Sequence, residues 1–354
     1  MNQSKPTVLV TIPTYRRTGY LRETINSVIR QTFPDWRCIV FDNDPGRTAE
    51  GVVEELADSR IDYRNNGQNL GPTGNWNRCR EAAIESEMAY WALLEDDNLW
   101  DESFLETAVE SLGAHPEAAI YHSSCRLFKD SPEKVVGVLG SLWQADRDRI
   151  AELSPDQTVP ILCACGIMLS ATLSRVDKIR TVEAFDTNHN QSADYMMFTR
   201  IALRFNIVTD PQPRIWYRIH DDSVSGMFKK RGGRQRQVAY AKQMLLRVAV
   251  QLGVVTPQTF LERTMAVETI DPEAVPKTIL MWLRSDAPED VRKFGRAVLT
   301  GAGKRRRTWE RSTWEFKIAR LAGDWVIPHL PVLRRWACLL LRKPDPEARG
   351  NWDL

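Results

Sequence analysis

The first hundred residues alternate short apolar, β-branched runs with segments that have the spacing of an amphipathic helix. This alternation constrains the fold more than any other feature of the chain. The expected strands are 7–12, 37–41, 61–64 and 90–94, and the expected helices are 19–31, 48–56 and 75–84. The pattern predicts an α/β fold with a doubly wound, mostly parallel sheet flanked by helices. In such sheets ligands bind beyond the carboxyl ends of the strands.

The pattern is less regular beyond residue 100. We expect further helices at 104–112, 173–179 and 194–205, strands at 119–128, 206–209 and 215–219, and a mixed segment at 135–156. From residue 228 onward helical spacing dominates, with a clear amphipathic helix at 237–252 and repeated helix starts that carry proline in the first turn. The chain is therefore expected to consist of an α/β domain at 1–227 and a helical C-terminal region at 228–354.

The composition is that of a globular protein, with 43% hydrophobic and 27% charged residues. The formal net charge of +2 indicates neither a nucleic-acid nor a membrane partner, but the charge is unevenly distributed. Residues 301–354 carry 12 Lys/Arg against 6 Asp/Glu, whereas residues 1–300 carry 36 against 40. The positive charge therefore belongs to the C-terminal tail.

Basic and tryptophan residues alternate in this tail. Lys304-Arg305-Arg306-Arg307 precedes Trp309, and further Trp and Arg residues follow. Interleaved cations and indole rings suit an anionic membrane interface, where indoles lie at headgroup depth. Packing against the α/β domain and a protein interface are the two alternatives. Nothing in the sequence resembles a nucleic-acid-binding module, so we expect no nucleic-acid partner.

The six cysteines are scattered through apolar contexts and do not have the spacing of a zinc site. We expect buried, reduced thiols, which suit a reducing compartment. The first residues do not read as a signal peptide, and no stretch reaches the roughly 20 apolar residues that span a bilayer. A cytoplasmic protein is expected, with the tail as a candidate for peripheral contact with the inner face of the membrane.

Three polar clusters follow strands of the predicted sheet, at 14–17, 42–44 and 95–98. The last cluster contains Glu95, Asp96 and Asp97, whose like charges require a counter-charge. Carboxylate oxygens together with phosphate oxygens suit a hard divalent cation, Mg²⁺ or Mn²⁺. The alternative is that these acids cap the helix expected near Glu102.

The ordered motifs TIPTYRR, IVFDNDPG, NLGPTGNWNRCREAA, YWALLEDDNLW, SADYMMFTRIA and YRIHDDSVS resemble family 2 glycosyltransferases of the GT-A fold from about residue 6 to 225. The resemblance implies a catalytic domain with a donor half at about 1–100 and an acceptor half at about 101–227. It also implies that a set of residues contacts the nucleotide-sugar donor and that a metal binds at the acidic motif. The donor contacts are Pro13, Thr14, Tyr15, Arg17, Asp42, Asn75, Glu95, Asp96 and Arg218, and the metal contacts are Asp97, Asp96 and His220. Glu95 departs from the family, which has Asp there.

The resemblance also implies that Asp194, at the start of an expected helix, is the general base that takes a proton from the acceptor. The family commonly has an acidic pair at this point, but residue 193 is Ala, and Asp186 is the nearest alternative acid. From the residues alone Asp194 is equally a helix-terminal acid stabilised by the helix dipole. A lone His such as His220 is more often structural than a ligand.

These observations predict an inverting, metal-dependent glycosyltransferase. It would move a sugar from a nucleoside-diphosphate sugar, expected to be a UDP-sugar, to a hydroxyl of a glycan, lipid-linked or small-molecule acceptor. One alternative is a sugar-nucleotide or glycan-binding protein that has lost catalysis, which Ala193 favours. The other is a sugar nucleotidyltransferase, for which TIPTYRRTGY lacks the Gly-rich signature.

Overall fold

A computed structural model describes residues 7–139, 149–164, 167–189 and 192–220, with short pieces at 245–246, 248–256, 259–260, 289 and 293. The chain divides into two compact units, Met1–Asp271 and Pro272–Leu354, and almost all described residues belong to the first. The basic, Trp-bearing tail lies outside the described residues, so its role stays a prediction, as does the division at residue 227. Among the described residues, no helix has both the length and the apolar character to cross a bilayer.

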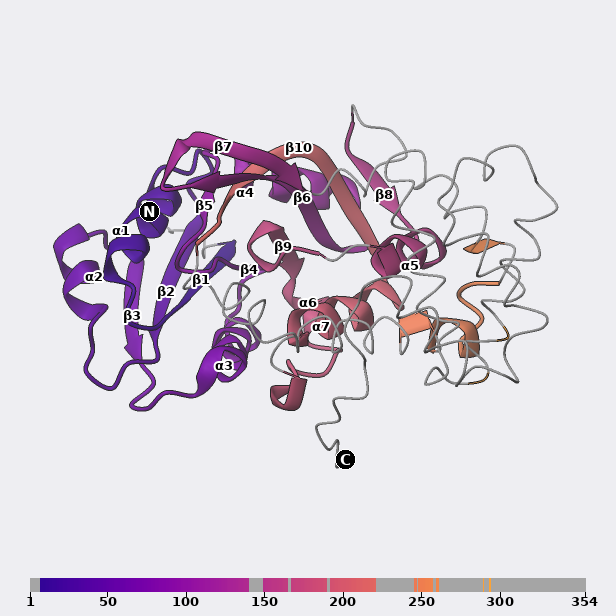
Figure 1. The fold of residues 1–354 in the computed structure, drawn as a ribbon, viewed down its shortest axis with the longest axis horizontal. Helices are drawn as coiled ribbons and strands as arrows, with labels where there is room; N and C mark the ends of the chain where they lie inside the picture. Colours follow the sequence, from indigo (N-terminus) through magenta and orange to yellow (C-terminus); the bar gives the residue numbers. More distant parts are fainter. Residues whose placement is uncertain are drawn as a thin grey trace, which may run out of the picture. The chain divides into compact units, whose positions relative to one another are not determined.

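The N-terminal half of the sheet is parallel, and its strands lie in the order β3-β2-β1-β4. These are β1 (Val8–Thr14), β2 (Trp36–Asp42), β3 (Ile61–Asn65) and β4 (Tyr90–Leu93). The connecting helices are α1 (Thr18–Ile29), α2 (Glu50–Leu56) and α3 (Gly71–Glu85). Because parallel crossovers are right-handed, α1 and α2 share one face of the sheet and α3 covers the other (Figure 1). The chain reverses direction across the sheet between β1 and β4, the place where open α/β sheets bind ligands.

The remainder of the sheet is mixed and continues from β4 through β9, β6, β10 and β5. Within it, β6 and β10 pair in parallel, while β9 runs antiparallel to both β4 and β6. The strands are β5 (Leu99–Trp100), β6 (Ala118–Lys129), β7 (Ser131–Leu139), β8 (Ala151–Leu153), β9 (Thr172–Arg175) and β10 (Asn206–Arg218). The helices are α4 (Phe104–Ala114), α5 (Pro155–Ala164), α6 (Val176–Ile179) and α7 (Ala193–Ala202), with short 3-10 turns η2 (Leu169–Ala171) and η3 (Thr187–His189).

Burial explains why the first strand and helix form where they do. Every residue of β1 is buried, as expected for a central parallel strand covered on both faces. In α1, the buried Leu21, Ile25 and Val28 follow helical spacing and join the core that contains Val8 and Val10. Burying each such side chain contributes roughly 1.5–3 kcal/mol. The core therefore fixes the carboxyl end of β1 beside the start of α1.

The α/β architecture with flanking helices is confirmed, but the sheet is mixed rather than mostly parallel, since five of the nine strand pairings that the structure describes are antiparallel. Helix α5 and strands β7 and β8 were not predicted. Residues 173–175, expected as the start of a helix, belong to strand β9, because their pairing with β4 and β6 outweighs a short helical spacing. Strand β5 was not predicted. The two strands expected at 206–209 and 215–219 are one strand, β10, whose register shifts near Pro211 and Pro213, where no backbone N–H is available for the ladder.

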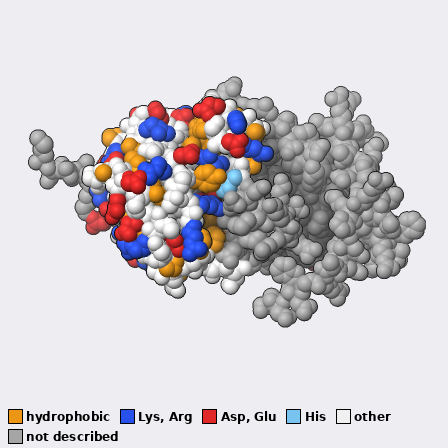
Figure 2. Space-filling model, turned by 60° about the vertical axis from the view of Figure 1, so that its left-hand side comes forward, with side chains coloured by type: hydrophobic (Ala, Val, Ile, Leu, Met, Phe, Trp, Pro, Cys, Tyr) orange, Lys and Arg blue, Asp and Glu red, His pale blue; other side chains and the backbone are white. Residues whose placement is uncertain are grey.

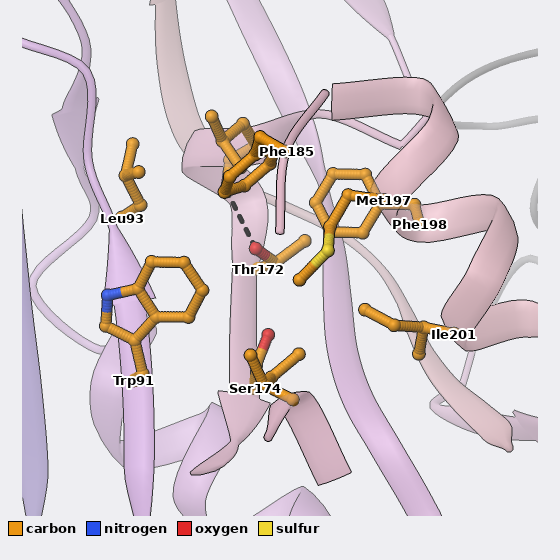
Figure 3. A pocket seen from close by; sticks show the side chains of 10 residues that line it. Trp91, Leu93, Thr172, Ser174, Phe185, Met197, Phe198 and Ile201 are labelled. Atoms are coloured by element: carbon orange, nitrogen blue, oxygen red, sulfur yellow. Dashed lines mark hydrogen bonds between the residues drawn. The ribbon is translucent and has the colours of Figure 1, made fainter. Parts of the chain in front are cut away.

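Helix α7 packs onto β4 and β9 through apolar side chains. Figure 3 shows Phe198 and Ile201 facing Trp91, Thr172 and Ser174. The space between them has a volume of about 10 Å³, which is room for about one water molecule. It is a packing gap of the core and too small for a sugar or a nucleotide. The side chains around this gap pack α7 against the sheet, and Asp194 lies in the first turn of this helix.

Candidate active site

The carboxyl ends of β1 and β4 are joined by a direct hydrogen bond between side chains. Thr14 Oγ1, at the end of β1, donates to Asp96 Oδ2 at 2.7 Å. Arg17 Nη1 lies 3.1 Å from Asp96 Oδ1 and 2.8 Å from Asp97 Oδ2. Thr14, Asp96 and Asp97 are all buried. The predicted convergence of two strand ends is therefore present as a compact, charged cluster.

The cluster carries more negative charge than Arg17 neutralises. Burial, together with the charges of Asp97, Asp194 and Asp96, raises the pKa of Glu95 to about 8. Burial and the charge of Asp97 raise the pKa of Asp96 to about 6, although Arg17 and Thr14 act in the opposite direction. Carboxyl groups whose pKa is raised by burial and by neighbouring acids are typical of functional sites, so the cluster is a candidate for one.

Ser170, in η2, holds Glu95 in place, and nothing in the sequence pattern pointed to it. Its Oγ donates to Glu95 Oε2 at 3.0 Å and accepts from the Glu95 backbone N–H at 3.1 Å. Asn98 Nδ2 donates to both Ser170 Oγ and Glu95 Oε2, each at 3.1 Å. The Trp100 indole donates to the Ser170 carbonyl at 2.8 Å. Glu95 is thus oriented by η2 rather than by its own loop alone.

The acids of the cluster do not cap helix α4. The turn before that helix is closed by Asp101, whose Oδ1 accepts from the Ser103 hydroxyl at 2.8 Å and from the Ser103 N–H at 3.3 Å. Glu95, Asp96 and Asp97 point to other partners. The helix-cap interpretation of the acidic cluster is wrong, because the N-cap residue of α4 is Ser103, six residues beyond Asp97.

His220 reaches the cluster from the end of β10. Its Nε2 lies 3.0 Å from Asp97 Oδ2, and its ring packs 5.1 Å from the Tyr20 ring centroid. The structure therefore brings His220 to the predicted metal-binding acid. Asp97 Oδ2 faces both His220 and Arg17.

Arg218 is buried beneath the cluster, with its side chain 3% exposed. Nε donates to the Asp97 carbonyl and Nη1 to the Asp130 carbonyl, both at 3.1 Å, and Nη2 pairs with Glu23 at 2.6 Å. The guanidinium also lies 4.6 Å from the rings of Tyr20 and Phe128. In this arrangement Arg218 positions the Asp97 backbone and does not face an open diphosphate site, so its predicted donor contact stays a prediction.

Asp42 ends β2 and is fully buried. Its carboxylate accepts from the backbone N–H of Asp44 at 2.8 Å, from that of Ala49 at 3.1 Å and from Tyr63 Oη at 2.9 Å. These bonds shape the turn between β2 and α2. Asp42 lies one strand away from Thr14, at the same edge of the sheet, and its contact with the nucleotide base stays a prediction.

Asn75 connects α3 to the end of β2. Its Nδ2 donates to the Phe41 carbonyl at 2.9 Å, and its Oδ1 accepts from Asn66 at 2.8 Å. Asn66 also donates to Asn43 at 2.9 Å. Asn75 therefore connects the 66–71 loop to the end of β2. Tyr15 is more exposed, at 38%, while Pro13 is buried within β1.

Asp194 lies in the first turn of α7, and its Oδ1 accepts from the Tyr195 N–H at 2.7 Å. Its charge is one of the causes that raise the pKa of Glu95, after burial and the charge of Asp97. Asp186 instead closes a turn, accepting from the Asn188 N–H at 2.9 Å. Asp194 is thus the acid of the second half of the domain whose charge acts on the cluster. The structure does not describe Ser223 and Ser225 of the YRIHDDSVS motif or the basic residues that follow at 229–231.

Residues 9–175 match the family described as Glycosyl transferase family 2. These residues form a glycosyltransferase family 2 domain. One relative of the chain is the Escherichia coli UDP-Glc:α-D-GlcNAc-diphosphoundecaprenol β-1,3-glucosyltransferase WfgD. It is 28% identical over 105 residues, which are 30% of this chain and 40% of WfgD. The chain covers less than half the length of the first curated relatives that it matches.

Two solved structures share the fold of this chain. S. aureus TarS, crystallised with UDP-GlcNAc, is 15% identical with a TM-score of 0.56, covering 84% of this chain and 92% of that one. The mannosyltransferase PcManGT of Pyrobaculum calidifontis, in complex with GDP-Man and Mn²⁺, is 15% identical with a TM-score of 0.50, covering 91% and 88%. Both confirm the GT-A type of fold.

The carboxylates of Asp96 and Asp97 are of the kind that holds Mg²⁺ or Mn²⁺, because these ions prefer oxygen ligands. Asp97 also faces His220, whose imidazole is a common ligand of transition metals. Within the part of the chain that the structure describes, no three His, Cys, Asp or Glu side chains are yet arranged as a metal site. Arg17 contacts the Asp97 oxygen that such an ion would bind. The residues fit the ion if Arg17 moves away.

Figure 2 shows one face of the molecule, on which the Lys and Arg side chains of the described residues are interspersed with Asp and Glu. No large patch of a single charge is seen among the described residues on this face. Interspersed charges of both signs give little long-range attraction to a charged ligand.

Proposed function

We propose that the chain is an inverting, metal-dependent glycosyltransferase whose donor is a nucleoside-diphosphate sugar. The observation that carries the proposal is the meeting of Thr14, Asp96, Asp97 and His220 at the switch point of the sheet, with Asp194 acting electrostatically on Glu95. This arrangement supplies a charged donor side and a separate carboxylate for the acceptor. The family match supports the same reaction class.

Thr14, Asp42 and Asn75 lie at the edge where the nucleoside would bind, and Pro13 and Tyr15 belong to the same turn. Asp97 and His220, with Asp96 beside them, would hold a divalent cation, which neutralises the diphosphate leaving group when it is bound. PcManGT bound Mn²⁺ in its own structure. The donor is proposed to be a UDP-sugar, as in the name of WfgD and in the TarS complex.

Asp194 is proposed as the general base. It takes the proton from the acceptor hydroxyl while the hydroxyl oxygen attacks the anomeric carbon from the face opposite the diphosphate. The new glycosidic bond forms as the bond to the diphosphate oxygen breaks, and the nucleoside diphosphate leaves with the electron pair. WfgD acts on a diphosphoundecaprenol-linked sugar according to its name. A glycan or lipid-linked acceptor is therefore proposed, which would give the basic tail a membrane-facing role.

The test is Mn²⁺-dependent hydrolysis and transfer from UDP-glucose and UDP-N-acetylglucosamine, measured for wild type, Asp194→Asn and Asp177→Asn. Asp177 is the matched control, because it is also an acid in the first turn of a helix but is exposed on α6. We expect a loss of about 10²–10⁴-fold in turnover for Asp194→Asn, with UDP binding retained, and no change for Asp177→Asn. Donor binding without turnover in wild type would favour the binding-protein alternative. Turnover unaffected by Asp194→Asn would remove Asp194 as the base.

A further inference from the structure

The guanidinium of Arg17 lies against the carboxylate oxygens that the proposed divalent ion would bind. Its Nη1 lies 2.8 Å from Asp97 Oδ2 and 3.1 Å from Asp96 Oδ1. Asp97 Oδ2 is also the atom that His220 Nε2 approaches at 3.0 Å. One carboxylate oxygen thus faces a guanidinium and an imidazole at once. An ion bonded to that oxygen, at the roughly 2.0–2.2 Å typical of Mg²⁺ and Mn²⁺ sites, would meet the Arg17 guanidinium directly.

We propose that Arg17 is a displaceable internal cation that neutralises Asp96 and Asp97 in the metal-free protein and must leave before a divalent ion can bind Asp97. The inference rests on the proposed metal site. A guanidinium and a divalent cation repel each other at contact distance, and both need the same oxygen lone pair. The two cations therefore compete, and the affinity for the metal alone is reduced by the free energy needed to remove Arg17.

The surroundings of Arg17 suit displacement, in contrast to those of Arg218. The Arg17 side chain is 22% exposed, and the residue precedes helix α1 in a turn where Arg16 adopts a left-handed conformation at φ 56°. Arg218, 3% exposed, is held by two backbone carbonyls, Glu23 and two aromatic rings. The cluster therefore has two neighbouring cations: Arg218, which is buried and held by several partners, and Arg17, which is partly exposed.

Displacement also gives Arg17 a second position with a partner. Once it leaves Asp97, the long side chain can turn toward an anion bound beside the cluster, and a guanidinium pairs well with diphosphate oxygens. A donor diphosphate would then attract Arg17 away from the acids and open them to the ion. Metal and donor binding would each favour the other, as linked equilibria require.

The test is the dissociation constant of Mn²⁺ without nucleotide, measured by the electron paramagnetic resonance signal of free Mn²⁺. The variants are Arg17→Gln and Arg17→Met, with Arg17→Lys to retain the charge. Arg22→Gln is the matched control, because Arg22 is a nearby arginine, in α1, whose side chain is 43% exposed and pairs with Glu55. Competition predicts at least tenfold tighter Mn²⁺ binding for the Gln and Met variants, and a value near that of wild type for the Lys variant and the control. Adding Asp97→Asn to Arg17→Gln must abolish the gain.

Two results would overturn the inference in distinguishable ways. Equal or weaker Mn²⁺ binding by folded Arg17→Gln and Arg17→Met, with Mn²⁺ still bound by wild type in the presence of UDP, refutes the competition and leaves the metal site standing. No Mn²⁺ binding by any variant, with or without UDP, refutes the metal site and the competition together. Circular dichroism establishes the fold of each variant. Met retains the apolar stem of Arg17 should Gln destabilise the turn.

Discussion

His220 Nε2 and Asp97 Oδ2 lie 3.0 Å apart, although 123 positions separate the two residues in the chain. Strand β10 brings His220 to the cluster because it runs parallel to β6 and reaches the edge where β4 ends. His220 and Arg17 approach the same Asp97 oxygen from different segments of the chain. Removing the imidazole therefore tests the contribution of β10 to the proposed metal site.

His220→Gln is expected to weaken Mn²⁺ binding by about 10–100-fold, the range seen when a side chain around a metal is removed, with little change in the midpoint of thermal unfolding. His115→Gln is the control, because His115 contacts Glu152 at the far end of the sheet. Calorimetric titration with MnCl₂ in the presence of UDP measures the constant. Unchanged Mn²⁺ affinity in His220→Gln would mean that the imidazole is structural.

Thr14→Val removes the hydroxyl that donates to Asp96 while keeping the shape of the side chain. A buried carboxylate oxygen that loses its donor costs about 1–3 kcal/mol of unfolding free energy. We expect that loss in urea denaturation, together with a higher donor KM, because Asp96 is no longer held toward β1. Thr14→Ser retains the hydroxyl and should stay close to wild type. Equal stability of the Val and Ser variants would show that the hydrogen bond contributes nothing net.

Arg218→Met distinguishes a positioning residue from a diphosphate ligand. Two backbone carbonyls lose their donor and two cation–π contacts disappear, so we expect a loss of about 2 kcal/mol or more in unfolding free energy. Glu23→Gln, the control, removes a half-exposed partner and should cost less than about 1 kcal/mol. A variant of unchanged stability that binds UDP more weakly would assign Arg218 to the donor instead.

Local pattern was enough to predict the strands that deliver Thr14 and Asp96, because β1 and β4 are apolar runs that end in polar residues. The convergence of their ends follows from parallel pairing. The mixed half was harder, since β5 has two residues and β10 contains two prolines. Such elements are determined by partners across the sheet and not by their own sequence.

Within the site, too, some features could be predicted from local sequence pattern and others could not. The acids and Arg17 were predicted because they follow strands, but the support that Ser170 gives to Glu95 comes from a 3-10 turn with no motif. The burial of Arg218 under Asp97 depends on how β6, β10 and α1 pack. This packing cannot be predicted from the spacing of residues in the sequence. Hydrogen bonds between segments 75 to 120 residues apart are a property of the folded sheet alone.

A pH prediction concerns His122, on β6, which is 1% exposed and lies outside the site. Its Nε2 accepts from the Met168 N–H at 3.4 Å, and burial lowers its pKa to about 3. Because the unfolded chain binds a proton at about pH 6.5 and the folded protein does not, the neutral His122 contributes stability above about pH 6.5. That contribution is lost as the pH falls toward 3.

Wild type should therefore lose about 1 kcal/mol more unfolding free energy than His122→Gln when the pH falls from 7.5 to 5.5. His122→Gln starts lower at pH 7.5, because it disturbs a packed strand, and the gap to wild type narrows in acid. Urea midpoints at the two pH values measure both effects, and the other histidines act equally in both proteins. Parallel pH profiles for the two proteins would show that folding does not lower the pKa of His122.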